Sequence, residues 1–183
     1  AINKVLKLTK EEKSRGVVAF SSGNHAQGIA YASRELGTSA KIVMPSDAPK
    51  IKIRKTQEYG AEVIFYERDE DNREEIGFSI AKEEGRKLIK PFDDLNVIYG
   101  QGTAALEVMD EVDTKFDMSV VCCSGGGLAA GTGIVLKNSL SDCQLYTAEP
   151  KDWNDHEKSF LQNNIVSIKT KKHGMCDALE NPQ

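Results

Sequence analysis

The sequence lacks the features that would tie it to a membrane or to nucleic acid. It holds no apolar run near the roughly 20 residues that a membrane helix needs, and no signal peptide opens it. Acidic residues outnumber basic ones, 28 to 24, which gives a formal net charge of -4. A nucleic-acid-binding domain would be basic. We therefore expect a cytoplasmic protein with neither a membrane nor a nucleic acid as partner.

The cysteines and glycines of the sequence also do not match the common motifs for metal sites, disulfides or nucleotide binding. The four cysteines have neither metal-ligand nor disulfide spacing, and Cys122 and Cys123 stand in an apolar run where small buried residues are expected. The 15 glycines include no Gly-Lys-Ser/Thr phosphate loop and no Gly-x-Gly-x-x-Gly dinucleotide motif. An unrelated nucleotide-binding domain is therefore disfavoured.

Both ends of the chain have the character of interior sequence. Residue 1 is Ala, and residues 1–8 are typical of the middle of a helix. Residues 181–183 follow a short apolar element without a closing strand or helix. We expect the parent protein to continue beyond both ends.

Strand-like and helix-like segments alternate in the first half of the chain. Strands are expected at 17–20, 40–44, 61–66 and 87–89, and helices at 24–36, 49–59 and 71–84. Gly37 and Gly60 stand where the first two helices would end, as C-terminal caps do. This alternation predicts a parallel sheet with helices on both faces.

A second set of elements follows a polar turn at residues 91–94. Helices are expected at 100–112 and 128–138, and strands at 118–123 and 144–148. The expected fold class is therefore α/β, with two parallel-sheet αβα domains. We assign residues 17–92 to a small domain, and residues 1–16 together with 93–183 to a large, incomplete one.

Two loops at the carboxyl ends of expected strands have the composition of anion sites. The first comprises Ser21, Ser22, Gly23, Asn24 and His25. The second comprises Ser124, Gly125, Gly126 and Gly127. Each would present main-chain N–H groups at a helix N-terminus, which suits a carboxylate or a phosphate. A simple helix cap is the alternative for the first loop and a flexible turn for the second. We expect Gly131 and Gly133, further along the helix, to serve close packing.

Four ordered strings resemble the fold-type II pyridoxal-phosphate (PLP) enzymes, whose fold is that of the tryptophan synthase β chain. They are Ser-Ser-Gly-Asn-His-Ala-Gln-Gly from Ser21, Gly-Gln-Gly-Thr from Gly100 with Glu107, the Ser-Gly-Gly-Gly loop, and Ala148-Glu149-Pro150. The resemblance is to the serine/threonine dehydratase and serine racemase family, and it covers essentially the whole chain.

The resemblance implies a role for each matching residue. Asn24 would hydrogen-bond the 3-hydroxyl of PLP, and Ser22 would be the catalytic base on the opposite face in a racemase. The cofactor phosphate would be bound by Ser124, Gly125, Gly126, Gly127 and Leu128. The substrate carboxylate would be bound by Ser21, Gly23 and His25. Glycine is more usual in the family where this chain has Ser124, so a hydroxyl replaces one main-chain contact there.

The same resemblance implies what lies outside the sequence. The Schiff-base lysine would fall just before residue 1, and a C-terminal segment would follow residue 183. The expected partners are a small hydroxy amino acid as substrate, the remaining segments of the parent chain, and a second copy in a homodimer.

A divalent cation is a further expectation from the family. The positions of Glu149, Trp153 and Asp155 match a site in which two carboxylates and a main-chain carbonyl bind Mg²⁺ or Ca²⁺, and oxygen ligands suit such hard cations. A solvated acidic turn is the alternative. His156 and His173 belong to no motif, and residues 169–172 are expected to be a solvated basic run.

The predicted function is that of a PLP-dependent ammonia-lyase, a threonine/serine dehydratase that makes a keto acid and ammonia. The string from Met175 to Leu179 resembles bacterial threonine dehydratase-like proteins, which favours this activity. A serine racemase is the close alternative. A non-catalytic module that only binds the cofactor or another anion is the third possibility.

Overall fold

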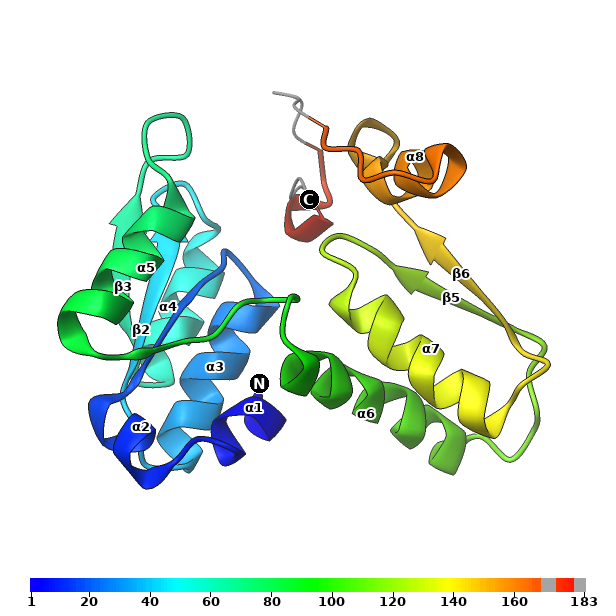
Figure 1. Cartoon of the computed structure of the whole chain (residues 1–183), viewed down its shortest axis with the longest axis horizontal. Helices are drawn as coiled ribbons and strands as arrows, with labels where there is room; N and C mark the ends of the chain where they lie inside the picture. Colours follow the sequence, from blue (N-terminus) through cyan, green and yellow to red (C-terminus); the bar gives the residue numbers. More distant parts are fainter. Residues whose placement is uncertain (169–173, 180–183) are drawn as a thin grey trace. The chain divides into compact units, whose positions relative to one another are not determined.

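A computed structural model describes residues 1–168 and 174–179, and the chain divides into two compact units, Ala1–Val97 and Ile98–Gln183 (Figure 1). Each unit has its own parallel sheet, as the alternation of elements predicts. The basic run at residues 169–172 and His173 lie outside the described residues. In the part of the chain that the structure describes, no helix is long and apolar enough to cross a bilayer.

Strand β1 (Val17–Phe20) lies inside the sheet of the first unit. It pairs in parallel with β2 (Ala40–Pro45) on one side and with β4 (Lys87–Leu88) on the other, and β2 pairs with β3 (Glu62–Tyr66). The strand order is β3-β2-β1-β4. All residues of β1 are buried, because the run Val-Val-Ala-Phe packs under helices on both faces.

Alternate residues of β1 belong to two separate hydrophobic clusters. One cluster includes Val17, Ala19, Ile42 and Ile29, the last from α3 (Asn24–Glu35). The other includes Val18, Phe20 and Val43, with Ile76 and Ile80 of α5 (Arg73–Glu84) packed against it. The period of two along the strand therefore assigns α3 to one face of the sheet and α5 to the other.

Two predicted helix ends coincide with left-handed glycines. Gly37 follows α3 with φ 67°, and Gly60 follows α4 (Lys50–Glu58) with φ 86°. Glycine adopts this conformation without the steric cost that a Cβ would add. The sequence placed these two C-terminal caps correctly.

The amino-terminal segment differs from its predicted assignment to the second domain. Residues 1–16 form α1 (Ile2–Leu6) and α2 (Lys10–Arg15), which are separated by residues 7–9. Thr9 is the N-cap of α2 and forms a capping box with Glu12. This cap explains why α1 and α2 are two helices and not one continuous helix. Val5 and Leu8 belong to the core of the first unit, so this segment lies in that unit.

The second unit is built around a two-stranded parallel sheet. Strand β5 (Met118–Cys122) pairs with β6 (Gln144–Ala148) in the register Met118↔Gln144 to Cys122↔Ala148. The helices are α6 (Leu95–Glu111), which begins just before the division, α7 (Gly127–Ser139) and α8 (Asp155–Gln162). Two short 3-10 turns lie at Lys151–Trp153 and Asp177–Leu179.

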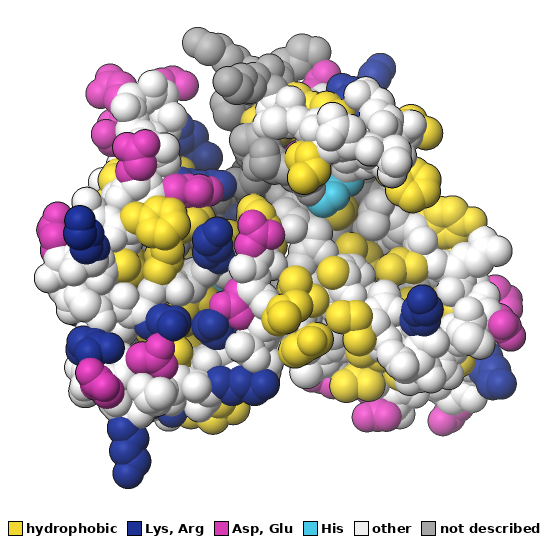
Figure 2. Space-filling model, viewed as in Figure 1, with side chains coloured by type: hydrophobic (Ala, Val, Ile, Leu, Met, Phe, Trp, Pro, Cys, Tyr) yellow, Lys and Arg dark blue, Asp and Glu magenta, His cyan; other side chains and the backbone are white. Residues whose placement is uncertain are grey.

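Apolar side chains reach the surface of this unit (Figure 2). Val120, Met118 and Tyr146 of its sheet are 61%, 59% and 49% exposed. Strand β5 alternates between exposed and half-buried residues, as a strand does when one face of its sheet is uncovered, and β6 is exposed at every position except Leu145.

Helices α6 and α7 contact each other through glycines. A Cβ added at Gly131 would lie 2.5 Å from the carbonyl oxygen of Ile98 and 2.6 Å from the nitrogen of Gly102. A Cβ at Gly133 would meet only the Cδ2 atom of Leu145, at 3.1 Å. The close-packing role is therefore confirmed for Gly131, whereas Gly133 has only this one side-chain neighbour.

Candidate functional site

The loop after β1 presents the N-terminus of α3. The nitrogen of Ser21 donates to the carbonyl of Val43 and so continues the sheet, while the nitrogen of Gly23 donates to the Ser21 hydroxyl at 3.2 Å. Gly23 is the cap residue and has no side chain, so no capping side chain covers the first N–H groups of α3. Ser22 is half-buried and Asn24 is exposed. The loop can therefore offer several hydrogen-bond donors to an anion.

His25 has its side chain engaged elsewhere in the first unit. Its Nε2 atom lies 3.3 Å from the carbonyl oxygen of Ile89, and since a carbonyl only accepts, Nε2 carries the proton. Burial lowers the pKa of His25 to about 4, so the ring is neutral near pH 7. The Nε2 donor is thus not available to a carboxylate. The predicted contact between His25 and the substrate would have to use its main-chain N–H.

The glycine loop lies between β5 and α7. The nitrogen of Cys123 donates to the carbonyl of Ala148 at 2.9 Å, which extends the strand pairing, and α7 begins at Gly127. Gly126 is the cap residue in a left-handed conformation, φ 78°, and it offers no side-chain cap. A helix N-terminus whose preceding turn is free of side chains lets an anion approach main-chain N–H groups closely. The residues present therefore fit a phosphate group.

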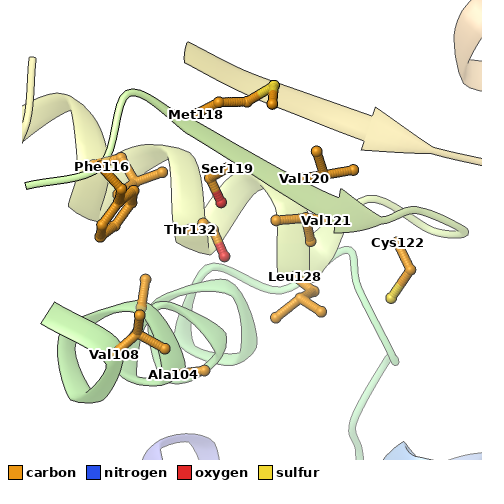
Figure 3. Close-up of a pocket in the computed structure, with 12 residues that line it drawn as sticks. Ala104, Val108, Phe116, Met118, Ser119, Val120, Val121, Cys122, Leu128 and Thr132 are labelled. Carbon is orange, nitrogen blue, oxygen red and sulfur yellow. The ribbon is translucent and has the colours of Figure 1, made fainter. Parts of the chain in front are cut away.

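Leu128 takes part in the loop only through its main chain. Its side chain lines an apolar groove of about 420 Å³ between α6, β5 and α7, together with Val108 and Val121 (Figure 3). The side chains that line the groove include no charged group. A groove with such a lining does not suit an anion.

His156, which belongs to no sequence motif, contacts the glycine loop. Its Nε2 atom donates a hydrogen bond to the carbonyl oxygen of Ser124. A Cβ added at Gly126 would lie 3.2 Å from the ring atom Cε1 of His156. His156 and Ser124 lie 32 positions apart, so no local pattern could have revealed their contact.

The three residues of the predicted cation site lie near the start of α8. Glu149 accepts hydrogen bonds from the main-chain nitrogens of His156 at 3.1 Å and Glu157 at 2.9 Å, and so caps the helix. Asp155 is 1% exposed and Trp153 is 8% exposed. Among the described residues, no group of three or more His, Cys, Asp or Glu side chains could hold a metal. Two carboxylates and a carbonyl remain a donor set of the kind that Mg²⁺ or Ca²⁺ uses.

Cys123 has no role as a nucleophile in this geometry. Burial raises the pKa of its thiol to about 11, and the carboxylates of Glu149 and Asp155 add to this effect. A thiol of this kind stays protonated at neutral pH and is inert. Cys123 is buried, as predicted, whereas Cys122 is exposed and that prediction is wrong, because Cys122 lies on the uncovered side of β5.

The predicted residues fall into two groups, each within one unit. Five of them form the loop at the start of α3 in the first unit: Ser21, Ser22, Gly23, Asn24 and His25. The second unit holds the glycine loop and the acidic residues beside α8. Within that unit the charges of Glu149 and Asp155 act on Cys123, which directly precedes the loop.

Comparison with known proteins gives the family of the chain. The sequence profile described as "Pyridoxal-phosphate dependent enzyme" matches residues 1–182. A serine racemase from Schizosaccharomyces pombe is 42% identical over 172 residues, covering 94% of this chain and 53% of the relative. An L-threo-3-hydroxyaspartate ammonia-lyase from Saccharomyces cerevisiae is 45% identical over 172 residues, covering 94% and 52%. The chain spans about half the length of the curated relatives it matches.

Solved structures agree with this assignment. Maize serine racemase is 32% identical with a TM-score of 0.92, and the match covers 99% of this chain and 54% of that one. The processed form of threonine deaminase isoform 2 from Solanum lycopersicum is 30% identical with a TM-score of 0.89, covering 99% and 52%. The predicted fold-type II architecture is therefore confirmed. With its parallel sheets and its glycine loop at the start of α7, the chain belongs to the family of pyridoxal-phosphate dependent enzymes.

Proposed function

We propose that the whole protein carrying this chain is a PLP-dependent ammonia-lyase that converts L-threonine or L-serine to a keto acid and ammonia. The observation that carries this proposal is the glycine loop at the start of α7, in a chain of this family. Two relatives 45% identical to it, from Saccharomyces cerevisiae and Pseudomonas sp., are L-threo-3-hydroxyaspartate ammonia-lyases. Their substrate shares a β-hydroxyl with threonine and serine.

The residues of the second unit would hold the cofactor by its phosphate. Main-chain N–H groups around Gly125, Gly127 and Leu128 would bind the anion, with help from the positive end of the α7 dipole. The Ser124 hydroxyl would add one further donor. When bound, PLP supplies an electron sink for the charge that develops as the substrate loses its Cα proton.

The loop of the first unit would bind the substrate. The uncapped N–H groups at the start of α3 and the Ser21 hydroxyl suit a carboxylate, and Asn24 would donate to the 3-hydroxyl of the cofactor. Loss of the Cα proton and of the β-hydroxyl, followed by hydrolysis of the released enamine, yields keto acid and ammonia. We expect the protein to be a cytoplasmic homodimer, and light scattering tests the dimer.

The test is a product analysis of the whole protein loaded with PLP. L-threonine, L-serine and L-threo-3-hydroxyaspartate are supplied separately, and keto acid and ammonia are measured together. We expect equal amounts of the two products from at least one of the first two substrates. A protein that binds PLP but releases neither product from any of them would overturn the lyase assignment.

A serine racemase is the second candidate. The 42% identity to the Schizosaccharomyces pombe enzyme and the likeness to maize serine racemase favour it. Ser22, half-buried in the loop before α3, would then return a proton to Cα from the opposite face. Production of D-serine from L-serine, faster than production of pyruvate, would identify this activity.

We also propose that Glu149, Trp153 and Asp155 bind Mg²⁺ or Ca²⁺. Support comes from the burial of Asp155 and from the position of both carboxylates close to Cys123. A cation that binds only the folded protein raises its melting temperature. We expect millimolar Ca²⁺ to raise the Tm of the wild-type protein but not that of Asp155→Asn. An equal Tm with and without either cation would favour a simple acidic turn.

A further inference from the structure

The glycine loop is held by a side chain from a distant helix. His156, in the first turn of α8, donates from Nε2 to the carbonyl oxygen of Ser124, and its ring lies against the α-carbon side of Gly126. The main-chain nitrogen of His156 is itself held by the carboxylate of Glu149, at 3.1 Å. The imidazole is thus fixed at its backbone and at its ring.

The hydrogen bond to Ser124 sets the direction of the next main-chain donor. The described chain has no cis peptide bond, so the Ser124 carbonyl and the Gly125 N–H point to opposite sides of one planar peptide. While His156 holds the carbonyl, the Gly125 N–H must point away from the imidazole. Without that contact, a segment of three successive glycines would be free to rotate this peptide.

We propose that His156 is a positioning residue for the phosphate-binding loop: it orients the Ser124–Gly125 peptide so that its N–H faces the anion. This inference rests on the proposed function, since it assumes that the loop binds the phosphate of PLP. It assigns His156 no contact with the cofactor. The effect of His156 is therefore specific to ligands that carry a phosphate.

The experiment measures binding rather than turnover. The whole protein is freed of cofactor and titrated with PLP, with pyridoxal, which lacks the phosphate, and with inorganic phosphate. The variants are His156→Ala, His156→Gln, which keeps an N–H donor, and His156→Phe, which keeps a ring without a donor. Phe160→Ala is the matched control, because Phe160 is in the same helix and 87% exposed.

We expect His156→Ala and His156→Phe to bind PLP about three- to tenfold more weakly, the usual worth of one hydrogen bond, with unchanged affinity for pyridoxal. The phosphorus NMR signal of bound PLP should shift in both variants. His156→Gln should restore the affinity and the signal, and Phe160→Ala should match the wild type. His156→Phe keeps the test decisive if the alanine variant does not fold.

Two results would overturn the inference. One is wild-type affinity and an unchanged phosphorus signal in His156→Phe. The other is an equal loss of affinity for PLP and pyridoxal, which would mean a general structural role. If the wild-type protein binds PLP no better than pyridoxal, it is the proposed function that fails. The affinities of wild type and His156→Phe for inorganic phosphate then decide the inference by themselves.

Discussion

At position 126 both the backbone conformation and the neighbouring His156 ring favour glycine over a residue with a Cβ. Gly126 has φ 78°, where an L side chain costs about 1–2 kcal/mol, and the His156 ring would lie 3.2 Å from a Cβ. We expect Gly126→Ala to lower the free energy of unfolding by more than the conformational cost alone. In a His156→Ala background only that conformational cost should remain. Urea denaturation of the two single variants and the double variant measures the difference.

Strict additivity of the two substitutions would contradict this account. It would mean that the ring moves aside freely and that the contact in the structure constrains neither residue. The same set of variants also serves as a stability control for the binding experiment on His156. A loss of PLP affinity that follows the loss of stability across all variants would point to folding rather than to loop geometry.

His25 should make the folded protein sensitive to moderate acid. Burial lowers the folded-state pKa of His25 from 6.5 to about 4, so the unfolded chain takes up this proton first as the pH falls. The contribution of His25 to the free energy of unfolding is fully present above a pH of about 6.5. It is lost as the pH falls towards about 4, and the loss amounts to up to about 3 kcal/mol. His25→Gln, which keeps a donor for the Ile89 carbonyl, should lose less stability over that window. Equal acid sensitivity in both proteins would assign the effect to other groups.

At the scale of elements, the contact between α6 and α7 is the most demanding. We expect Gly131→Ala to destabilise the protein by about 2 kcal/mol, because its Cβ would meet the backbone of α6, which cannot move aside as a side chain can. Gly133→Ala is the matched control. It meets only the end of Leu145 and gains helix propensity, so its stability should stay within about 1 kcal/mol of wild type. Chemical denaturation compares them, and similar losses in both would refute the role of close packing.

Elements with a clear local signal could be predicted from the sequence. The strands of the first unit are apolar runs, and Gly37 and Gly60 mark helix ends. Helix α6 begins at Leu95 rather than at residue 100, because the Asp94 carboxylate accepts hydrogen bonds from the main-chain N–H groups of Asn96 and Val97 and so caps an earlier start. Glycines at the predicted start hid this cap.

Helix α8 was not predicted, because its apolar residues do not mark a buried face. Phe160 and Leu161 are 87% and 75% exposed, and the cap of the helix comes from Glu149, several residues upstream. The assignment of residues 1–16 to the first unit could not be predicted either. It depends on the packing of Val5 and Leu8 into the core of that unit, and no pattern within the segment specifies this contact.

At the scale of the whole molecule, the two proposed activities, elimination and racemisation, make different demands on Ser22. Both require removal of the Cα proton, but only racemisation needs a second base on the opposite face. We expect Ser22→Ala in the whole protein to lower D-serine formation at least tenfold more than keto acid formation. Parallel assays of D-serine, pyruvate and ammonia from L-serine measure the two rates. Equal losses of both products would show that Ser22 serves binding rather than proton transfer.

The two loops of the candidate site could be located from the sequence, while their roles stay predictions. Each loop has a local signature, so the residues from Ser21 to His25 and the glycine loop could be named from the sequence alone. The protonation state of His25 could not be predicted, since its low pKa follows from burial beside Ile89, 64 positions away. The contact of His156 with the glycine loop depends in the same way on tertiary structure.

The placement of β1 inside its sheet has a consequence for how the protein is made. β1 is translated before its hydrogen-bonding partners, β2 and β4, which are completed only at Pro45 and Leu88. Non-local pairing of this kind delays folding until the partner strands are available. During vectorial synthesis, the Val-Val-Ala-Phe segment must therefore remain outside the ribosome without its full sheet for about 70 residues, or roughly 4 to 14 seconds at typical elongation rates. That interval is when this apolar segment would be most open to a chaperone.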